Sequence, residues 1–190
     1  MRNFTYPLIC ISIAVLASGC GRTVNTAAVP TTGAVAAQSV VVTTGSITFD
    51  KEVTYKTVDI LGVGPAFEAK LKEAGITKVE QLLLEGSTRT ERGHLADATG
   101  ISEKLILTWV NHCDLMRVTG CGPEYARLLE RAGVDTVVEL AGRNSITLAA
   151  KLKAANDLGG GKVCVKRLPD VVTTTKWVNN AAQFRRLITY

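Results

Sequence analysis

The chain has 190 residues, of which 46% are apolar and 21% charged, with a formal net charge of +5. This composition is that of an ordinary globular protein, and it argues against both a wholly disordered chain and a polytopic membrane protein. Aromatic residues make up only 5%, which argues against an aromatic platform for single-stranded nucleic acid. Two histidines leave little material for a metalloenzyme or for histidine-based acid–base catalysis.

Residues 1–19 have the pattern of an export signal, with Arg2 followed by an apolar run over residues 8–16. That run is too short for a permanent membrane-spanning helix. It ends in Ala17-Ser18-Gly19-Cys20, which resembles a bacterial lipobox, where the cysteine sulfur accepts a diacylglycerol. We therefore predict an exported protein that is lipid-anchored to the cell envelope through Cys20. The outer membrane is slightly favoured by Gly21, and a cleaved secretory signal or an uncleaved anchor are the alternatives.

Residues 20–58 are predicted to be the lipidated cysteine and a flexible tether. Up to about Ser46 the composition is dominated by Thr, Val, Ala and Gly, with no charge after Arg22. A single strand over residues 39–43 is the alternative, because that run is rich in valine and threonine. Residues 49–58 alternate loosely and favour a short strand or an extended lead-in.

From residue 59 onward the pattern is helical and it repeats. Residues 60–67 align with residues 118–125 at an offset of 58, with glycines, proline and apolar positions coinciding. We therefore predict one domain over residues 59–190, with repeat one at 59–117 and repeat two at 118–190. Each repeat contains a Gly-apolar-Gly turn, a proline at the first position of a helix, and a glycine, Gly75 or Gly133, as a left-handed stop.

Helix caps give the remaining boundaries. A Thr77 to Glu80 capping box begins the second helix, Asp135 is the equivalent cap in repeat two, and Thr88 to Glu91 is a further capping box. Gly100 ends that helix, and Ser102 begins one that runs to about Met116. The last helix is predicted to start after Asp170 and to run to about Leu187, with Gly159-Gly160-Gly161 breaking the helix before it. The fold class is thus all-α, with about eight helices and no substantial sheet.

The turns Gly62-Val63-Gly64-Pro65 and Gly120-Cys121-Gly122-Pro123 resemble the helix-hairpin-helix motif. More closely, residues 59–187 are similar to the bacterial family catalogued as domain of unknown function 4332. The similarity extends to the segment from Thr99 to Trp109 and to the closing Leu168-Pro169 and Trp177. It covers about two-thirds of the chain and implies a tandem helix-hairpin-helix fold.

In DNA-binding helix-hairpin-helix proteins, hairpin amides and the helix dipole hold a backbone phosphate without reading sequence. The resemblance implies that the phosphate donors here are Gly62, Val63, Gly64, Gly120, Cys121 and Gly122. The sequence departs from such binders at Ala66 and Glu124, where a base is common, and Glu124 is expected to repel an anion. Lys70 and Lys72 are candidates to assist the first hairpin. The alternative is that the glycines merely permit a tight turn.

Positive charge is concentrated in the second repeat, which has 11 bases and 6 acids against 7 bases and 9 acids in the first. A basic cluster is predicted to attract DNA or anionic headgroups, with a solvated helix face as the alternative. Its members are Lys162, Lys166, Arg167, Lys176, Arg185 and Arg186.

No pattern in the chain predicts catalysis or a cofactor. Gly62-Val63-Gly64 lacks the third glycine of a dinucleotide fingerprint, and Gly161-Lys162 is followed by Val163 instead of Ser or Thr. His112, Cys113 and Cys121 are an incomplete tetrahedral set, so no metal site is predicted. Trp109 and Trp177 recur at matching points of the repeat and are predicted to be core residues. Cys113, Cys121 and Cys164 are expected to form either one disulfide and one free thiol or three buried thiols.

The leading interpretation is a non-enzymatic binding module with weak, sequence-independent affinity for double-stranded DNA. The alternative is a protein-interaction or structural module of the envelope, with an unknown envelope protein as its partner. A new kind of enzyme is a distant third.

Overall fold

A computed structural model of the protein describes residues 55–157 and 164–190. The described residues form eight α-helices and no strand, which confirms the all-α expectation, and only an isolated bridge joins Lys56 to Lys78. No described helix combines the length and the apolar character needed to cross a membrane. Predictions for Cys20, the tether up to residue 54, the strand at 39–43, Gly159-Gly160-Gly161 and Lys162 lie outside the described residues.

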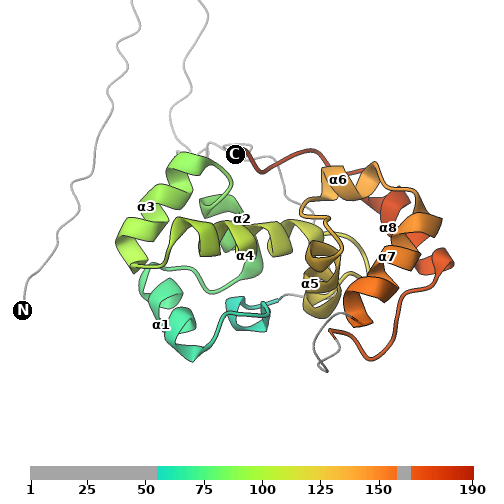
Figure 1. Ribbon diagram of the computed structural model, residues 1–190. Coiled ribbons are helices and arrows are strands. Elements are labelled where there is room, and N and C mark those ends of the chain that lie inside the picture. Colours follow the sequence, from blue (N-terminus) through green and yellow to red (C-terminus); the bar gives the residue numbers. More distant parts are fainter. Residues whose placement is uncertain (1–54, 158–163) are drawn as a thin grey trace, which may run out of the picture. The chain divides into compact units, whose positions relative to one another are not determined.

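The same order of helices occurs twice (Figure 1). A short 3-10 helix, η1 (Thr57–Asp59), precedes α1 (Pro65–Glu73), α2 (Val79–Glu85), α3 (Arg89–Thr99) and α4 (Glu103–Leu115). Helices α5 (Pro123–Arg131), α6 (Val137–Ala141), α7 (Ser145–Asp157) and α8 (Val171–Ala181) follow. In the first half α4 packs against α2 and α3, and in the second half α8 packs against α6 and α7.

Several predicted helix boundaries are confirmed. Pro65 and Pro123 are the first residues of α1 and α5. Gly75 and Gly133 adopt φ values of 83° and 79°, the left-handed region in which glycine has no Cβ to clash. Gly100, with φ 63°, ends α3 in the same way.

Two predicted caps are displaced by one residue. At α2 the Gln81 Oε1 atom accepts the amides of both Thr77 and Lys78, so the acceptor is Gln81 and not Glu80. At α6 the hydroxyl of Thr136 accepts the amide of Glu139, while the amide of Asp135 donates back to the Glu139 carboxylate. Both helices therefore begin one residue later than predicted. The reason is that a side chain one position further on reaches the free amides.

The lead-in and the last helix also differ from expectation. The described end of the lead-in holds η1 in place of a strand. Helix α8 begins after Asp170 as predicted, with the Asp170 carboxylate accepting the Thr173 amide, but it ends at Ala181, six residues before Leu187. The chain leaves the helix there because its C-terminal residues bond to the first half of the domain.

The C-terminal residues 182–190, here called the tail, return to the first half (Figure 1). The Thr189 amide donates to the Ser87 carbonyl at 2.9 Å. The buried guanidinium of Arg92 donates to the Thr189 carbonyl at 2.8 Å and to the carbonyls of Gly86 and Ser87. The two halves are thus joined at a second place, beyond the contact between α4 and α5.

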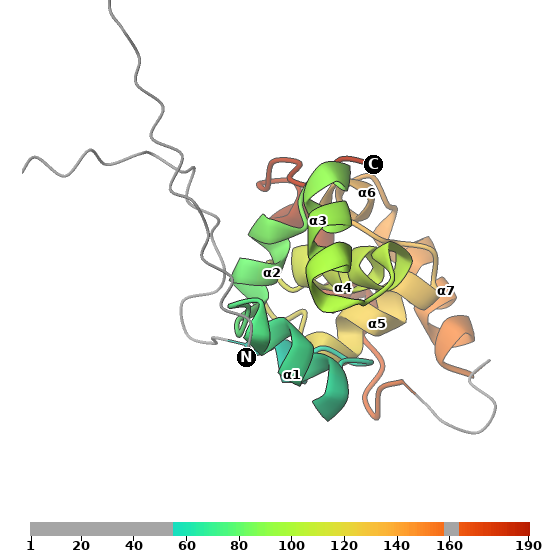
Figure 2. The ribbon, with the colours of Figure 1, turned by 90° about the vertical axis from the view of Figure 1, so that its left-hand side faces the viewer.

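Figure 2, turned by 90°, shows α4 between α3 and α5. Residues of α4 are buried continuously from Trp109 to Leu115, because this helix contacts α2 and α3 on one side and α5 on the other. The core therefore runs through both halves without a gap at the junction. This packing brings the start of α5, and with it the second hairpin, beside the first half.

Candidate functional site

Each hairpin is a tight turn whose first glycine requires a left-handed backbone. Gly62 has φ 107° and Gly120 has φ 78°. The middle amide of each turn is already used, because Val63 donates to the Ile60 carbonyl at 3.0 Å and Cys121 donates to the Val118 carbonyl at 2.9 Å. Within the described residues, the glycine amides on either side of them donate to no protein group. Of the six predicted phosphate donors, the structure therefore leaves four amides available: Gly62, Gly64, Gly120 and Gly122.

A buried tryptophan supports each hairpin from beneath. A Cβ placed on Gly62 would lie 3.4 Å from Nε1 of Trp109, and one on Gly120 would lie 3.8 Å from Nε1 of Trp177. The two indoles are 1% and 2% exposed, which confirms that both are core residues. Phe67 meets Trp109 edge-on, with ring centroids 5.3 Å apart, and Tyr125 contacts Trp177 at 5.1 Å. Each indole thus packs against the turn of its own repeat.

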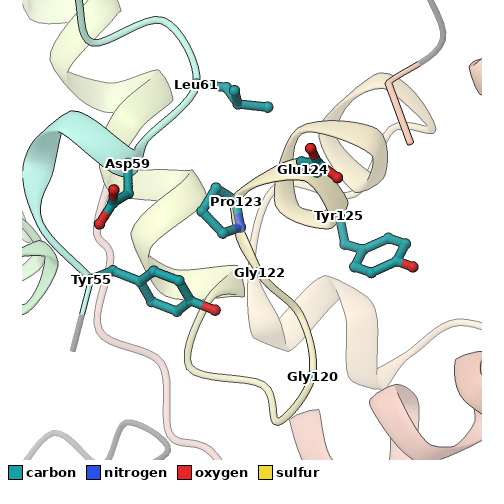
Figure 3. Close-up of a pocket in the computed structure, with 8 residues that line it drawn as sticks. All are labelled: Tyr55, Asp59, Leu61, Gly120, Gly122, Pro123, Glu124 and Tyr125. Atoms are coloured by element: carbon teal, nitrogen blue, oxygen red, sulfur yellow. The ribbon is translucent and has the colours of Figure 1, made fainter. Parts of the chain in front are cut away.

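The second hairpin borders an open hollow of about 730 Å³ (Figure 3). Gly120, Gly122 and Pro123 of this hairpin line it, together with Leu61, which directly precedes the first hairpin. Figure 3 shows Pro123 between the lead-in residues on one side and the first turn of α5 on the other. The remaining lining residues are Tyr55, Asp59, Glu124 and Tyr125. The second hairpin and the residue before the first, far apart in sequence, therefore meet at this hollow.

The charge at this hollow is negative. Its lining residues include the carboxylates of Asp59 and Glu124 and no lysine or arginine. Asp59 accepts the Lys56 amide at 2.7 Å and so caps η1, whereas Glu124 is exposed in the first turn of α5. A carboxylate near a helix N-terminus is favourable for the helix but opposes a bound anion.

One of the two lysines considered for the first hairpin, Lys70, lies near the end of α3. A Cβ on Gly100 would lie 3.7 Å from the Lys70 ammonium, which places that charge at the C-terminal end of α3. Cations are favourable at this end of a helix because its free carbonyls carry partial negative charge. The charge of Lys70 therefore stabilises the end of α3. Lys72 is exposed.

The five described members of the predicted basic cluster are all exposed, but they lie on separate segments. Lys166 and Arg167 come near the second hairpin, since the Tyr125 hydroxyl donates to the Arg167 carbonyl at 3.1 Å. Lys176 is on α8. Arg185 and Arg186 belong to the tail, where the Arg185 carbonyl accepts from Arg117. The hydrogen bond to Tyr125 thus ties the first pair to the start of α5.

Buried polar pairs were not predicted from the sequence. Arg117 donates to the Asp114 carboxylate at 2.7 Å, with both side chains almost fully buried, and the second Asp114 oxygen accepts the Val137 amide at 3.0 Å. Burial raises the pKa of Asp114, although the Val137 amide and Arg117 oppose that shift. The spacing of three residues within one helical turn was the only signal in the sequence that could have suggested the pair.

A second pair lies where α4 meets α5. The His112 Nε2 atom is 2.8 Å from the Glu130 carboxylate. The hydrogen bond with His112 lowers the pKa of Glu130 against the opposing effect of burial. His112 is 2% exposed, so this contact is part of the packing between the two halves.

The three described cysteines are free thiols. Cys113 and Cys121 are buried, and burial raises the pKa of both thiols, whereas Cys164 is half-buried and accepts a hydrogen bond from Arg131. The predicted disulfide is absent among these three cysteines, and the alternative of three buried thiols holds for only two of them. In the part of the chain that the structure describes, no three metal-ligating side chains come together.

The described residues thus define an all-helical domain whose halves each contain a glycine hairpin, the second of which lines an open hollow. The profile of the family described as Domain of unknown function (DUF4332) matches residues 61–184. The chain therefore belongs to that family. No curated protein and no solved structure matches the chain.

Proposed function

We propose that this chain is a non-enzymatic binding module of the cell envelope whose hairpins are helix-hairpin-helix elements that contact the backbone of double-stranded DNA. The single observation that carries the proposal is that both hairpins leave their outer glycine amides without a protein acceptor among the described residues, those of Gly120 and Gly122 at the open hollow. Amides at a helix N-terminus are suited to phosphate because the helix dipole adds positive potential there. Lys166 and Arg167, held near the second hairpin through Tyr125, would add attraction that is independent of base sequence.

A second candidate is a protein-interaction module of the envelope that has no affinity for nucleic acid. It is favoured by the carboxylates of Asp59 and Glu124 at the hollow, which repel phosphate. The tight turns would then serve only to connect α1 and α5 to the segments before them. The first candidate predicts that replacing Glu124 with a base strengthens DNA binding. The second predicts no DNA binding with or without the Glu124 charge.

The DNA proposal is tested by titrating duplexes of unrelated sequence at several salt concentrations. Affinity should be indifferent to sequence and should fall steeply with salt. Glu124→Lys is expected to strengthen binding and to steepen the salt slope by about one unit, because it replaces a repulsive charge with a phosphate contact. Glu85→Lys at the end of α2 is the matched control, since it makes the same change in net charge away from the hairpins. Absence of duplex binding at low salt in the wild type and in Glu124→Lys would leave the protein-interaction candidate.

We further propose that the module is held at the membrane by a lipid on Cys20, with the outer membrane favoured. The support is the small-residue segment that ends at Cys20 after a short apolar run. Metabolic labelling with a palmitate analogue should mark the wild type and not Cys20→Ser. Equal labelling of the two proteins would reject the anchor.

A further inference from the structure

Four large aliphatic side chains are exposed near the starts of α7 and α8. Ile146 is 65% exposed, Val172 62%, Val171 43% and Leu168 36%. Scattered single apolar residues are normal at a protein surface, but a group in one place indicates an interaction site. The four residues are called here the aliphatic face.

The segments that carry the aliphatic face pack together: they are the first turns of α7 and α8 and the residues just before α8. The Thr174 hydroxyl lies 3.0 Å from the Ser145 carbonyl and 3.0 Å from the Val171 carbonyl. This contact fixes the first turn of α7, with Ile146, beside the first turn of α8, with Val171 and Val172. Figure 1 shows the same two helices side by side. Leu168 precedes α8 by three residues.

Basic side chains flank the aliphatic face. Lys166 and Arg167 directly precede Leu168, and Lys176 is four residues after Val172, which places the two on the same side of α8. All three bases are exposed. The acid in this stretch is Asp170, whose carboxylate accepts the Thr173 amide at 2.7 Å and so caps α8. Around the exposed aliphatic residues, positive charge therefore exceeds negative charge.

We propose that the aliphatic face, with Lys166, Arg167 and Lys176 beside it, docks on the surface of an anionic lipid membrane. Aliphatic side chains at a membrane interface enter the boundary between headgroups and acyl chains, which removes their apolar surface from water. Lysine and arginine beside them attract anionic phosphates, each changing the affinity by about fivefold near the surface. Charge complementarity thus selects a lipid surface in preference to an apolar protein partner.

This inference goes beyond the proposed DNA contact and does not depend on it. The aliphatic face shares no residue with the hollow at the second hairpin. It also does not require the lipid on Cys20, although a tether to the same membrane would raise the local concentration of the face. Docking would hold the second half of the domain against the membrane.

The test uses the chain from residue 20 with Cys20→Ser, which removes the predicted signal segment and acylation site but keeps all the residues that the structure describes. It is sedimented with vesicles of phosphatidylethanolamine and phosphatidylglycerol, and with vesicles of phosphatidylcholine alone. The protein is expected to sediment with the anionic vesicles and to be released by salt, because the flanking bases contribute to binding.

Matched variants separate the aliphatic face from general charge attraction. Val172→Asp should weaken binding to the anionic vesicles about tenfold. It replaces an apolar side chain, which the membrane would bury, with a negative charge that the anionic lipids repel. Leu84→Asp is the control: it makes the same charge change at an exposed aliphatic residue of α2, and it should change binding less than about twofold. Asp170→Asn keeps a residue that caps helices well and removes the negative charge, so binding should strengthen about fivefold.

Circular dichroism of each variant confirms that it remains folded. The proposal is overturned if the wild type does not sediment with anionic vesicles, or if Val172→Asp and Leu84→Asp weaken binding equally. Duplex titration of the same proteins distinguishes the two interactions. Val172→Asp should lower vesicle affinity more than Leu84→Asp does. Glu124→Lys should mainly raise the affinity for duplex DNA.

Discussion

Replacing Arg117 with alanine is expected to lower the free energy of unfolding by about 3–5 kcal/mol. The change leaves the Asp114 carboxylate buried without its partner, and it also removes the hydrogen bond to the Arg185 carbonyl and the guanidinium that lies 4.6 Å from the centre of the Phe184 ring. The tail would therefore lose one of its contacts with the rest of the domain. Urea denaturation followed by circular dichroism measures the effect.

The loss in Arg117→Ala should be larger at neutral pH than in acid. Without the arginine, the pKa of buried Asp114 rises further above its unfolded value, so the folded state binds a proton more readily than the unfolded chain does. Stability then falls as pH rises between the two pKa values. The control is Arg186→Ala, which removes an exposed arginine of the tail and should change the free energy of unfolding by less than about 0.5 kcal/mol. The double variant Asp114→Asn with Arg117→Met should recover part of the loss, and failure to recover any would show that charge burial is not its cause.

Replacing Trp109 with alanine is expected to cost about 3–5 kcal/mol, because the indole is 1% exposed and its removal leaves a large cavity. The contact with the Phe67 ring is lost as well. Trp109 Nε1 lies directly beneath Gly62, so the first hairpin would lose its support. Hydrogen exchange at the Val63 amide, which donates to the Ile60 carbonyl, should become faster than the loss of global stability alone explains.

Trp109→Phe is the matched comparison for the alanine variant. It keeps an aromatic ring in the core and should lose less stability, about 1–3 kcal/mol. Exchange at the Cys121 amide of the second hairpin should follow global stability only, since Trp177 supports that turn independently. If both hairpins exchange faster to the same extent in Trp109→Ala, the tryptophan stabilises the domain as a whole and not its own turn.

The fold class and most helix boundaries were predictable because they depend on residues close together in the chain. A proline at the first helical position, a left-handed glycine after the last turn and a serine or threonine cap each act within about five residues. The repeat at an offset of 58 residues and the recurring tryptophans could also be identified from the sequence alone. The displaced caps at Lys78 and Thr136 show the limit, because neighbouring polar side chains compete for the same free amides.

The candidate site was predictable only in its parts. The two turns were identified from their glycines, but the hollow that the second turn forms with Leu61 and Asp59 depends on how α5 packs against α4. That packing also determines that Glu124 and Asp59 border the same surface. The predicted basic cluster is distributed over three segments, because Lys166, Lys176 and Arg186 are far enough apart in sequence for packing to separate them.

The sequence by itself determined that this protein is helical, that its second part repeats its first, and which glycines turn the chain, because those properties follow from backbone preferences and short-range periodicity. Only the tertiary structure decided that the tail bonds to Ser87 and Arg92, that Asp114 and Arg117 are buried as a pair, and that the Thr174 hydroxyl bonds to the Ser145 carbonyl between α8 and α7. These contacts join residues whose proximity is set by the packing of whole helices. No local pattern encodes that packing, since each helix can bury its apolar side against several partners.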